Sequence, residues 1–203
     1  MADVNVVSSR PSREHVRARI LDAAMSTFAR YGFAGTTTDA VANAAGFTKG
    51  AVYSNFASKD DLFFALMDQQ IEIRARLAAD VVRDLPPHAA AALAVIGERL
   101  TNAMTENRDW QVLFLDYWAR AVRDPVIGAR FAEHRRAARQ VITEAIVELA
   151  QSLNVTMPLP PDLVTLVILG LSNGLAVEEL ADPGTVPSSL IGTVLNRLAA
   201  PSS

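Results

Sequence analysis

Cysteine is absent from the 203 residues, and lysine occurs only twice. Without cysteine there is no disulfide framework, no thiolate metal site and no cysteine nucleophile. The three histidines, His15, His88 and His134, lie far apart in the sequence and form no HxxxH or HExxH pattern. These absences disfavour an enzyme, and we expect neither a cofactor nor a metal site.

Long hydrophobic runs are also scarce. The longest, Leu163–Val177, covers about fifteen residues and is interrupted by Thr165, Ser172 and Asn173, whereas a bilayer span needs about 20. We therefore expect a buried or interfacial helix here and no membrane partner. Residues 1–11 lack the apolar segment of a signal peptide, which predicts a cytoplasmic location.

Charge is unevenly distributed along the chain. The formal net charge is −3, but residues 1–59 carry seven basic and four acidic side chains, so the remainder is acidic. This asymmetry suits a DNA-facing head on an acidic body. Lys49 and Lys59 both fall within the basic segment. Either both contact phosphate, or both are exposed there by chance.

Apolar residues recur at helical spacing throughout, and no strand-type alternation stands out, so we predict an all-α fold of about nine helices. Gly32 and Gly46 are expected to end helices, and Pro125, Pro161 and Pro187 to begin them. The predicted helices are 13–31, 39–45, 49–55, 59–83, 88–106, 110–123, 125–153, 161–181 and 187–199.

Two short helices around Gly46 predict a helix-turn-helix. Ala42 is small enough for the helices to cross, and Gly46 tolerates the positive φ of the turn. Val52 and Phe56, one turn apart, anchor the second helix. Its opposite face is polar, as the major groove requires, and Gly50 permits close approach. That face consists of Thr48, Lys49, Tyr53, Ser54 and Asn55.

The segment Gly35–Leu62 resembles the signature of the tetracycline-repressor (TetR) family almost residue for residue. Ile20–Ala24 and Phe28–Phe33 are similar to that family's first helix. The resemblance covers about fifty residues and implies a ligand-responsive transcriptional regulator that binds a palindromic operator in double-stranded DNA as a dimer. Members of the family are usually repressors, so the resemblance implies a repressor, with an activator as the alternative. Asn55 departs from the family, which often has histidine there.

The resemblance also implies contacts with DNA. Thr38, Tyr53 and Lys59 are expected to bind phosphate. Thr48, Lys49 and Gly50 begin the recognition helix and are expected to meet phosphate and base edges. Ser54 and Asn55 complete this set. Arg13 and Arg17 either contact the DNA backbone or are solvated.

The family's second domain binds the ligand and dimerises. Trp110, Phe114 and Tyr117 share one helix face within about 60°, with Trp118 at its edge. Such a stripe is either a core or the wall of an apolar ligand pocket. Asn173, in an apolar helix, needs a hydrogen-bond partner from backbone, a second subunit or a ligand. The expected neighbours in the pocket are Met67, Ile71, Met104, Phe131 and Asn173.

Gly170 and Gly174 form a small-xxx-small pair that allows helices to approach closely. The resemblance implies that the last two helices pair with those of a second subunit in a homodimer; an intramolecular core is the alternative. The predicted organisation is a disordered arm over 1–12, a helix-turn-helix domain over 13–60, and a ligand-binding and dimerisation domain over 61–203. An enzyme, or an interaction protein that has lost DNA binding, remains a less favoured class.

Overall fold

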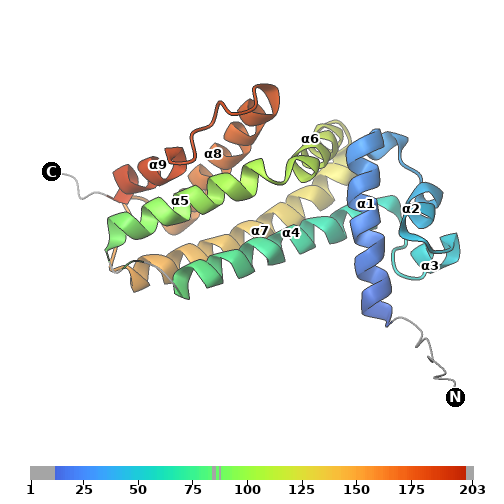
Figure 1. Ribbon diagram of the computed structural model, residues 1–203, viewed down its shortest axis with the longest axis horizontal. Coiled ribbons are helices and arrows are strands. Elements are labelled where there is room, and N and C mark those ends of the chain that lie inside the picture. Colours follow the sequence, from blue (N-terminus) through green and yellow to red (C-terminus); the bar gives the residue numbers. More distant parts are fainter. Residues whose placement is uncertain (1–11, 84–85, 87, 200–203) are drawn as a thin grey trace, which may run out of the picture. The chain divides into compact units, whose positions relative to one another are not determined.

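The computed structural model describes residues 12–83, 86 and 88–199, without the side chains of 74, 75 and 77–83. Over these ranges the chain forms nine helices and no strand, which confirms the predicted all-α fold (Figure 1). The predicted arm lies outside the described residues except for Ser12. The helices are α1 (Arg13–Gly35), α2 (Thr38–Ala45), α3 (Lys49–Tyr53), α4 (Lys59–Arg83), α5 (Ala89–Thr105), α6 (Arg108–Arg123), α7 (Pro125–Ser152), α8 (Pro161–Ala181) and α9 (Leu190–Ala199).

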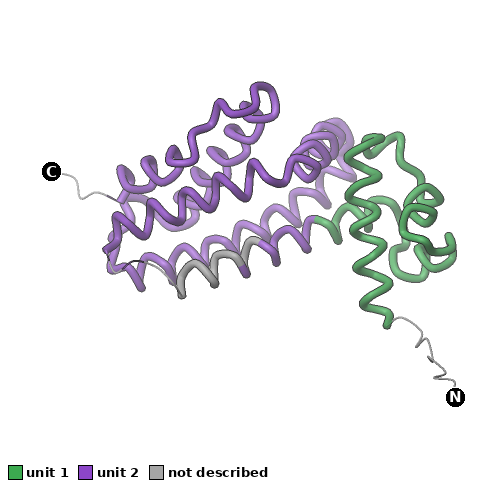
Figure 2. Tube along the Cα trace, viewed as in Figure 1, with its two compact units in different colours: residues 1–66 green, residues 67–203 purple. Residues whose placement is uncertain are grey.

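The chain divides into two compact units, residues 1–66 and 67–203, drawn in different colours in Figure 2. Unit 1 contains α1, α2, α3 and the first residues of α4. Unit 2 contains the rest of α4 and the five helices that follow. One continuous helix therefore contributes residues to both units.

Short polar side chains fix where several helices begin. A side-chain oxygen at the N-cap accepts a hydrogen bond from a backbone N–H that has no partner inside the helix. Thr48 and Ser58 accept such bonds from Ala51 N at 3.2 Å and from Asp61 N at 3.0 Å. The same arrangement occurs at Ser12, Thr37 and Asp124.

Two predicted helix boundaries, the end of α1 and the start of α9, differ most from the structure. Gly32 has φ 71° and ψ 165°, as expected, but the chain resumes a helical turn to Gly35 beyond this kink. The carbonyl of Gly32 accepts hydrogen bonds from both N and Oγ1 of Thr36, the residue that ends this turn. At the other end, α9 begins at Leu190 rather than Pro187, since Pro187 lies in a turn whose carbonyl accepts from Leu190 N at 3.0 Å.

The core of unit 1 is built by apolar side chains at helical spacing along α1, which meet α2 and the start of α4. Phe28 and Phe33 stack with ring centroids 5.3 Å apart, and Phe33 meets Phe63 edge-on at 6.3 Å. Such aromatic pairs stabilise beyond the area they bury. The core also contains Ile20, Leu21, Ala24, Val41, Ala42, Ala45, Val52, Phe56 and Leu62.

Unit 2 is a helical bundle in which α5 packs on α9, α6 on α7, and α7 on α8 (Figure 1). Helices α5 and α9 touch backbone to backbone, because a Cβ on Gly97 would fall on the main chain of Ile191 and Gly192. The pair of glycines that the sequence singled out, Gly170 and Gly174, is not used in this way: within the described chain, nothing lies within 4 Å of a Cβ added at either.

Helix α8 has few buried residues in the single chain, where the sequence predicted a buried or interfacial helix. Its 21 residues are long and apolar enough to cross a membrane, with a mean hydropathy of 1.6, and 11% of the apolar window is buried. One side nevertheless packs within the unit: Thr165 is fully buried and its hydroxyl lies 2.7 Å from that of Thr143 on α7. The opposite side of α8 carries exposed apolar residues, among them Leu163, Leu166 and Val177.

Candidate DNA-reading surface and effector cavity

Helices α2 and α3 form the predicted helix-turn-helix. Gly46 has φ 73° and ends α2 in the left-handed conformation that favours glycine. Val41, Ala42 and Val52 are buried, so both helices are anchored through their apolar faces. Beyond the turn, the N–H of Phe47 donates to the carbonyl of Ala42 at 3.0 Å. The local chain thus fixes the angle at which α3 leaves α2.

Two arginines of α1, Arg19 and Arg17, contact the C-terminal ends of these two helices. Arg19 donates from Nη2 to the carbonyl of Ala45, the last residue of α2, at 3.0 Å. Its guanidinium also lies 5.1 Å from the ring centroid of Phe47. A cation at the C-terminus of a helix is stabilised by the helix dipole, and cation–π contact adds to this. Sequence reasoning missed Arg19, because nothing in the sequence shows which helix end an arginine reaches.

Arg17 makes the same two kinds of contact just beyond the end of α3. Its Nη1 donates to the carbonyl of Asn55 at 3.4 Å, and its guanidinium lies 4.4 Å from the ring centroid of Phe56. Its side chain is exposed as well. The structure therefore places Arg17 at the end of the recognition helix, where it positions α3.

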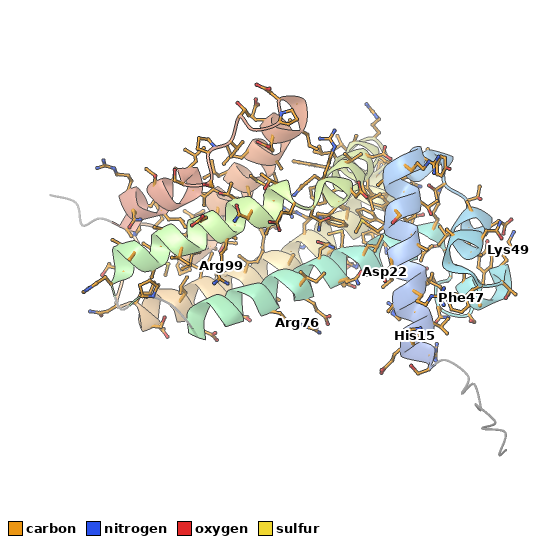
Figure 3. The ribbon with its side chains drawn as sticks, viewed as in Figure 1. His15, Asp22, Phe47, Lys49, Arg76 and Arg99 are labelled. Carbon is orange, nitrogen blue, oxygen red and sulfur yellow. The ribbon has the colours of Figure 1, made fainter. Side chains whose placement is uncertain are left out.

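The predicted reading face is exposed over α3, at Thr48, Lys49, Gly50, Tyr53 and Ser54. Lys49 lies on the side of the two short helices away from α1 (Figure 3). Its Nζ pairs with a carboxylate oxygen of Asp39 on α2 at 2.9 Å. This hydrogen bond raises the pKa of Lys49 above its usual value. A DNA phosphate must therefore compete with Asp39 for this ammonium.

Two further side chains that are predicted to contact DNA, Ser54 and Asn55, make hydrogen bonds within the protein. Asn55 is half-buried and donates from Nδ2 to the carbonyl of Ala51 at 2.8 Å, which Ser54 Oγ also reaches at 2.9 Å. Both side chains thus complete the last turn of α3. Thr38 is half-buried at the first position of α2, directly after the capping Thr37.

Lys59, the first residue of α4, lies against the junction of α1 and α2. Its Nζ donates to the carbonyls of Phe33 at 2.6 Å and Thr36 at 2.9 Å, with Ala34 farther away at 3.4 Å. The ammonium is also 4.6 Å from the ring centroid of Phe33. Lys59 therefore binds the start of α4 to the end of α1, and its predicted contact with phosphate stays a prediction.

Unit 2 contains a large cavity of about 1010 Å³, with a lining that is mostly apolar. Helices α4 to α9 all contribute to it. Six of the nine predicted ligand-binding residues lie in its wall: Met67, Ile71, Met104, Trp110, Phe114 and Asn173. The volume is at the upper end of ligand sites in proteins, which commonly measure about 300–1,000 Å³.

The other three predicted residues lie elsewhere. Tyr117 is fully buried and Phe131 is buried; their rings pack together with centroids 5.9 Å apart. Trp118 is 40% exposed and outside the cavity lining. One aromatic stripe therefore divides into two parts: Trp110 and Phe114 reach the cavity, while Tyr117 belongs to the core.

Most of the cavity wall was not foreseen from the sequence. Helix α7 supplies residues along its length, from Arg135 and Ala138 to Leu149 and Ser152. The sequence predicted a helix over 125–153 but did not show that one face of this helix lines a cavity. A second, smaller cavity of about 370 Å³ shares Met104 and Gln111 with the large one.

One hydrolase-type pattern occurs in the sequence. Residues 170–174, Gly-Leu-Ser-Asn-Gly, have the spacing GxSxG of a nucleophile elbow. That motif requires a sharp turn from strand to helix, whereas Ser172 lies inside the continuous helix α8. No group of three or more potential metal ligands occurs in the described part of the chain either.

An exposed polar face on the second helix of a helix-turn-helix, with a separate helical unit around an apolar cavity, defines a DNA-binding transcriptional regulator. Two family models match the chain. "Bacterial regulatory proteins, tetR family" covers residues 20–66, and "BetI-type transcriptional repressor, C-terminal" covers residues 87–200. The protein belongs to the TetR family, and it is a DNA-binding transcriptional repressor rather than an enzyme.

Individual relatives agree with this assignment. The transcriptional repressor Rv1474c of Mycobacterium tuberculosis is 30% identical over 83% of this chain and 88% of its own. The repressor AcnR of Corynebacterium diphtheriae is 27% identical over 66% of this chain and 63% of its own. The fold matches that of the regulator FadR from Bacillus subtilis in complex with stearoyl-CoA, with a TM-score of 0.69 and 16% identity over 90% of this chain and 96% of that one.

The two lysines give a direct test of the DNA-reading surface. Lys49→Ala is expected to weaken specific and non-specific DNA binding alike and to flatten the salt dependence. If each subunit of a dimer loses one phosphate contact, the slope of log K against log salt falls by about 2 × 0.9. Fluorescence anisotropy over a salt series measures this slope.

Lys59→Ala is expected to flatten the slope by the same amount if its ammonium leaves the carbonyls of α1 for phosphate. If Lys59 only joins α1 to α4, the melting temperature falls and the slope does not change. Lys49→Arg is the control, because it keeps the charge and should keep the slope. Unchanged slopes for both alanine variants would show that the lysines do not contact phosphate.

Proposed function

We propose that this repressor binds a palindromic operator as a homodimer and that a small, largely apolar effector releases it by binding in the cavity of unit 2. The observation that carries this proposal is the cavity itself, because α4 lines it and also begins in the DNA-reading unit. A cytoplasmic location follows from operator binding.

The proposed dimer surface is the exposed face of α8. Its apolar residues and two glycines recur at three- and four-residue spacing and so form one stripe. At 1.5 Å per residue the stripe is about 27 Å long, and the exposed Glu178 lies at its edge. An exposed apolar surface of this kind marks an interaction site. Its members are Leu163, Leu166, Val167, Gly170, Gly174, Val177 and Ala181.

Helix α9 contributes less to this surface than the sequence suggested. Ile191 is buried against α5, and Leu195 and Leu198 line the cavity. The exposed residues of α9 include Thr193 and Arg197, which are polar. The proposal of a dimer through the last two helices therefore rests on α8, with α9 holding α5 in place behind it.

A dimer places two copies of α3 on DNA. For a two-fold symmetric helix-turn-helix protein, the recognition helices lie about 34–36 Å apart and enter successive major grooves of a palindrome. The effector then needs only to disturb this spacing. DNase I footprinting around the protein's own gene tests the operator proposal, which predicts a protected sequence with two-fold symmetry.

Helix α4 offers the route between effector and DNA. In unit 2, Met67, Gln70 and Ile71 of α4 line the cavity, and Gln70 accepts a 2.8 Å hydrogen bond from Asn107 at the start of α6. In unit 1, Lys59 of the same helix holds the carbonyls of Phe33 and Thr36. A ligand that displaces α4 in the cavity therefore acts on the helix whose first residue contacts the reading unit.

The size of the effect is bounded by linkage. A ligand shifts DNA binding only by its differential affinity for the two states, typically about 1–3 kcal/mol or about 5–150-fold. Phe114→Ala and Trp110→Ala are expected to keep operator affinity but to blunt release by an effector identified in a small-molecule screen. Each variant removes an apolar wall of the cavity while leaving unit 1 unchanged.

Electrophoretic mobility shifts with and without effector measure this release. The control is Val122→Ala, a 76%-exposed side chain on α6 outside the cavity lining. If both aromatic variants respond to effector like the wild type, the effector binds elsewhere.

A further inference from the structure

The cavity of unit 2 is elongated. Its lining residues on α7 begin at Arg135 and continue at helical spacing to Ser152. At 1.5 Å per residue this distance along the helix axis is about 26 Å. Helices α5 and α8 line the same cavity over many residues, from Leu93 to Met104 and from Val164 to Asn173. The geometry therefore suits a long, narrow ligand better than a compact one.

One end of this cavity is polar. Arg135 of α7 is half-buried and its guanidinium lies 5.4 Å from the ring centroid of Phe114 in the same wall. Gln70 and Gln111 also line the cavity and are only 6% and 7% exposed. Both lie near the start of α6: Gln111 belongs to that helix, and Gln70 accepts a hydrogen bond from its N-cap residue, Asn107.

Asn173 of α8 lies at about the same height along the bundle as Arg135 of α7. Helices α7 and α8 are consecutive and antiparallel (Figure 1), and Thr143 is paired with Thr165 through their hydroxyl groups. Asn173 follows Thr165 by just over two turns, and Arg135 precedes Thr143 by the same number of residues. The amide of Asn173 and the guanidinium of Arg135 therefore belong to one end of the cavity.

The remainder of the cavity is lined chiefly by aliphatic side chains. Arg99 and Glu148 are charged lining residues there, and both are exposed; Figure 3 labels Arg99 on α5. The exposed Glu106 directly precedes Asn107 and therefore belongs to the polar end. The aliphatic lining comprises Leu93, Ile96, Leu100, Val141, Ile142, Ile146, Leu149, Leu153, Val164, Val167, Ile168, Leu169, Leu195 and Leu198.

We propose that the effector is an amphipathic carboxylic acid with one long apolar chain, held with its carboxylate at Arg135 and its chain along α7. This inference rests on the proposed effector role of the cavity. Arginine binds a carboxylate through two parallel hydrogen bonds. The amides of Gln111, which is buried, and Asn173, which is half-buried, supply further polar contacts. Contact with the aliphatic walls removes apolar surface of the chain from water, which provides the apolar part of the affinity.

The two tryptophans allow a direct binding assay. Trp110 lines the cavity, whereas Trp118 is exposed and outside it. A Trp118→Phe protein therefore reports on the cavity through Trp110 fluorescence. The probes are palmitate, octanoate and the uncharged hexadecanol. We expect palmitate to bind most tightly, with octanoate weaker because it covers less of the apolar wall and hexadecanol weaker because it lacks the charge.

The decisive variant is Arg135→Gln. It is expected to weaken palmitate binding by about tenfold or more, as for the loss of a charge-assisted hydrogen bond, and to leave hexadecanol binding within about twofold. Arg135→Lys keeps the charge and should recover part of the loss. Arg136→Gln, an exposed neighbour outside the cavity lining, is the control and should bind palmitate like the parent. Circular dichroism confirms that each variant is folded.

The same probes separate this inference from the effector role. If hexadecanol and palmitate bind equally and Arg135→Gln changes neither, the carboxylate assignment is wrong while the cavity remains an effector site. If an Ile142→Phe, Leu149→Phe double variant whose Trp110 fluorescence no longer responds to palmitate still releases operator DNA in response to palmitate, the effector role of the cavity is wrong as well. A palmitate-specific loss in Arg135→Gln, accompanied by loss of operator release, supports both.

Discussion

Leu166→Glu is expected to convert the dimer into a monomer and to lower affinity for a palindromic operator by about a hundredfold or more. Leu166 is 55% exposed on the apolar stripe of α8, so a carboxylate there would be desolvated without a partner at the interface. Two linked reading heads gain about 10²–10⁴-fold over one head through effective concentration, and the monomer loses that gain.

Light scattering measures the mass directly. The wild type should have twice 21.8 kDa, and the variant 21.8 kDa. Gly174→Leu offers an independent route, because a large side chain at a position that is open in the single chain would hold two α8 helices apart. Val122→Glu is the matched control, since Val122 is more exposed than Leu166 but lies on α6. A Leu166→Glu protein that stays dimeric would exclude the α8 face as the interface.

The reading unit was the easiest part to predict, because its determinants are local. The cap at Thr48 and the turn at Gly46 each act over three or four residues, so the sequence contains all the information they need. The ends of the helices were less certain. The extension of α1 past Gly32 depends on Thr36, whose hydroxyl also reaches the carbonyl of Thr27 nine residues earlier.

The cavity shows why sequence reasoning stopped part-way. Trp110, Phe114 and Tyr117 share one face of α6, and helical periodicity cannot distinguish among them. Phe131 of α7 packs against both Phe114 and Tyr117, and this contact between helices decides which ring reaches the cavity. Arg135 was not singled out either, because its position over Phe114 also depends on the pairing of α6 with α7.

Glycine gave the sharpest difference between sequence and structure. Gly170 and Gly174 form a recognisable pattern within one helix, yet neither is packed against the described chain. Gly97 and Gly192 lie on helices almost a hundred residues apart and touch. Close approach of two helices needs small residues on both, and only the tertiary structure shows which two glycines meet.

Gly97→Ala is therefore expected to destabilise the protein strongly. An added Cβ would collide with the backbone of Ile191 and Gly192, so relief requires α5 and α9 to move apart. Overpacking of this kind costs about 1–3 kcal/mol or more, which exceeds the roughly 1 kcal/mol by which alanine favours a helix over glycine. The free energy of unfolding should fall, and in a chain of this size each kcal/mol lowers the melting temperature by about 2–4 °C.

Gly50→Ala is the matched control, because the nearest atom to its added Cβ is Thr48 Oγ1 at 3.9 Å; its stability should equal or slightly exceed that of the wild type. Wild-type stability of Gly97→Ala would mean that α5 and α9 are farther apart than described. The contact also concerns function, since Ile96 of α5 and Leu195 of α9 both line the cavity. Separating the two helices moves two walls of the effector site, so effector response should weaken in Gly97→Ala even at temperatures where the protein remains folded.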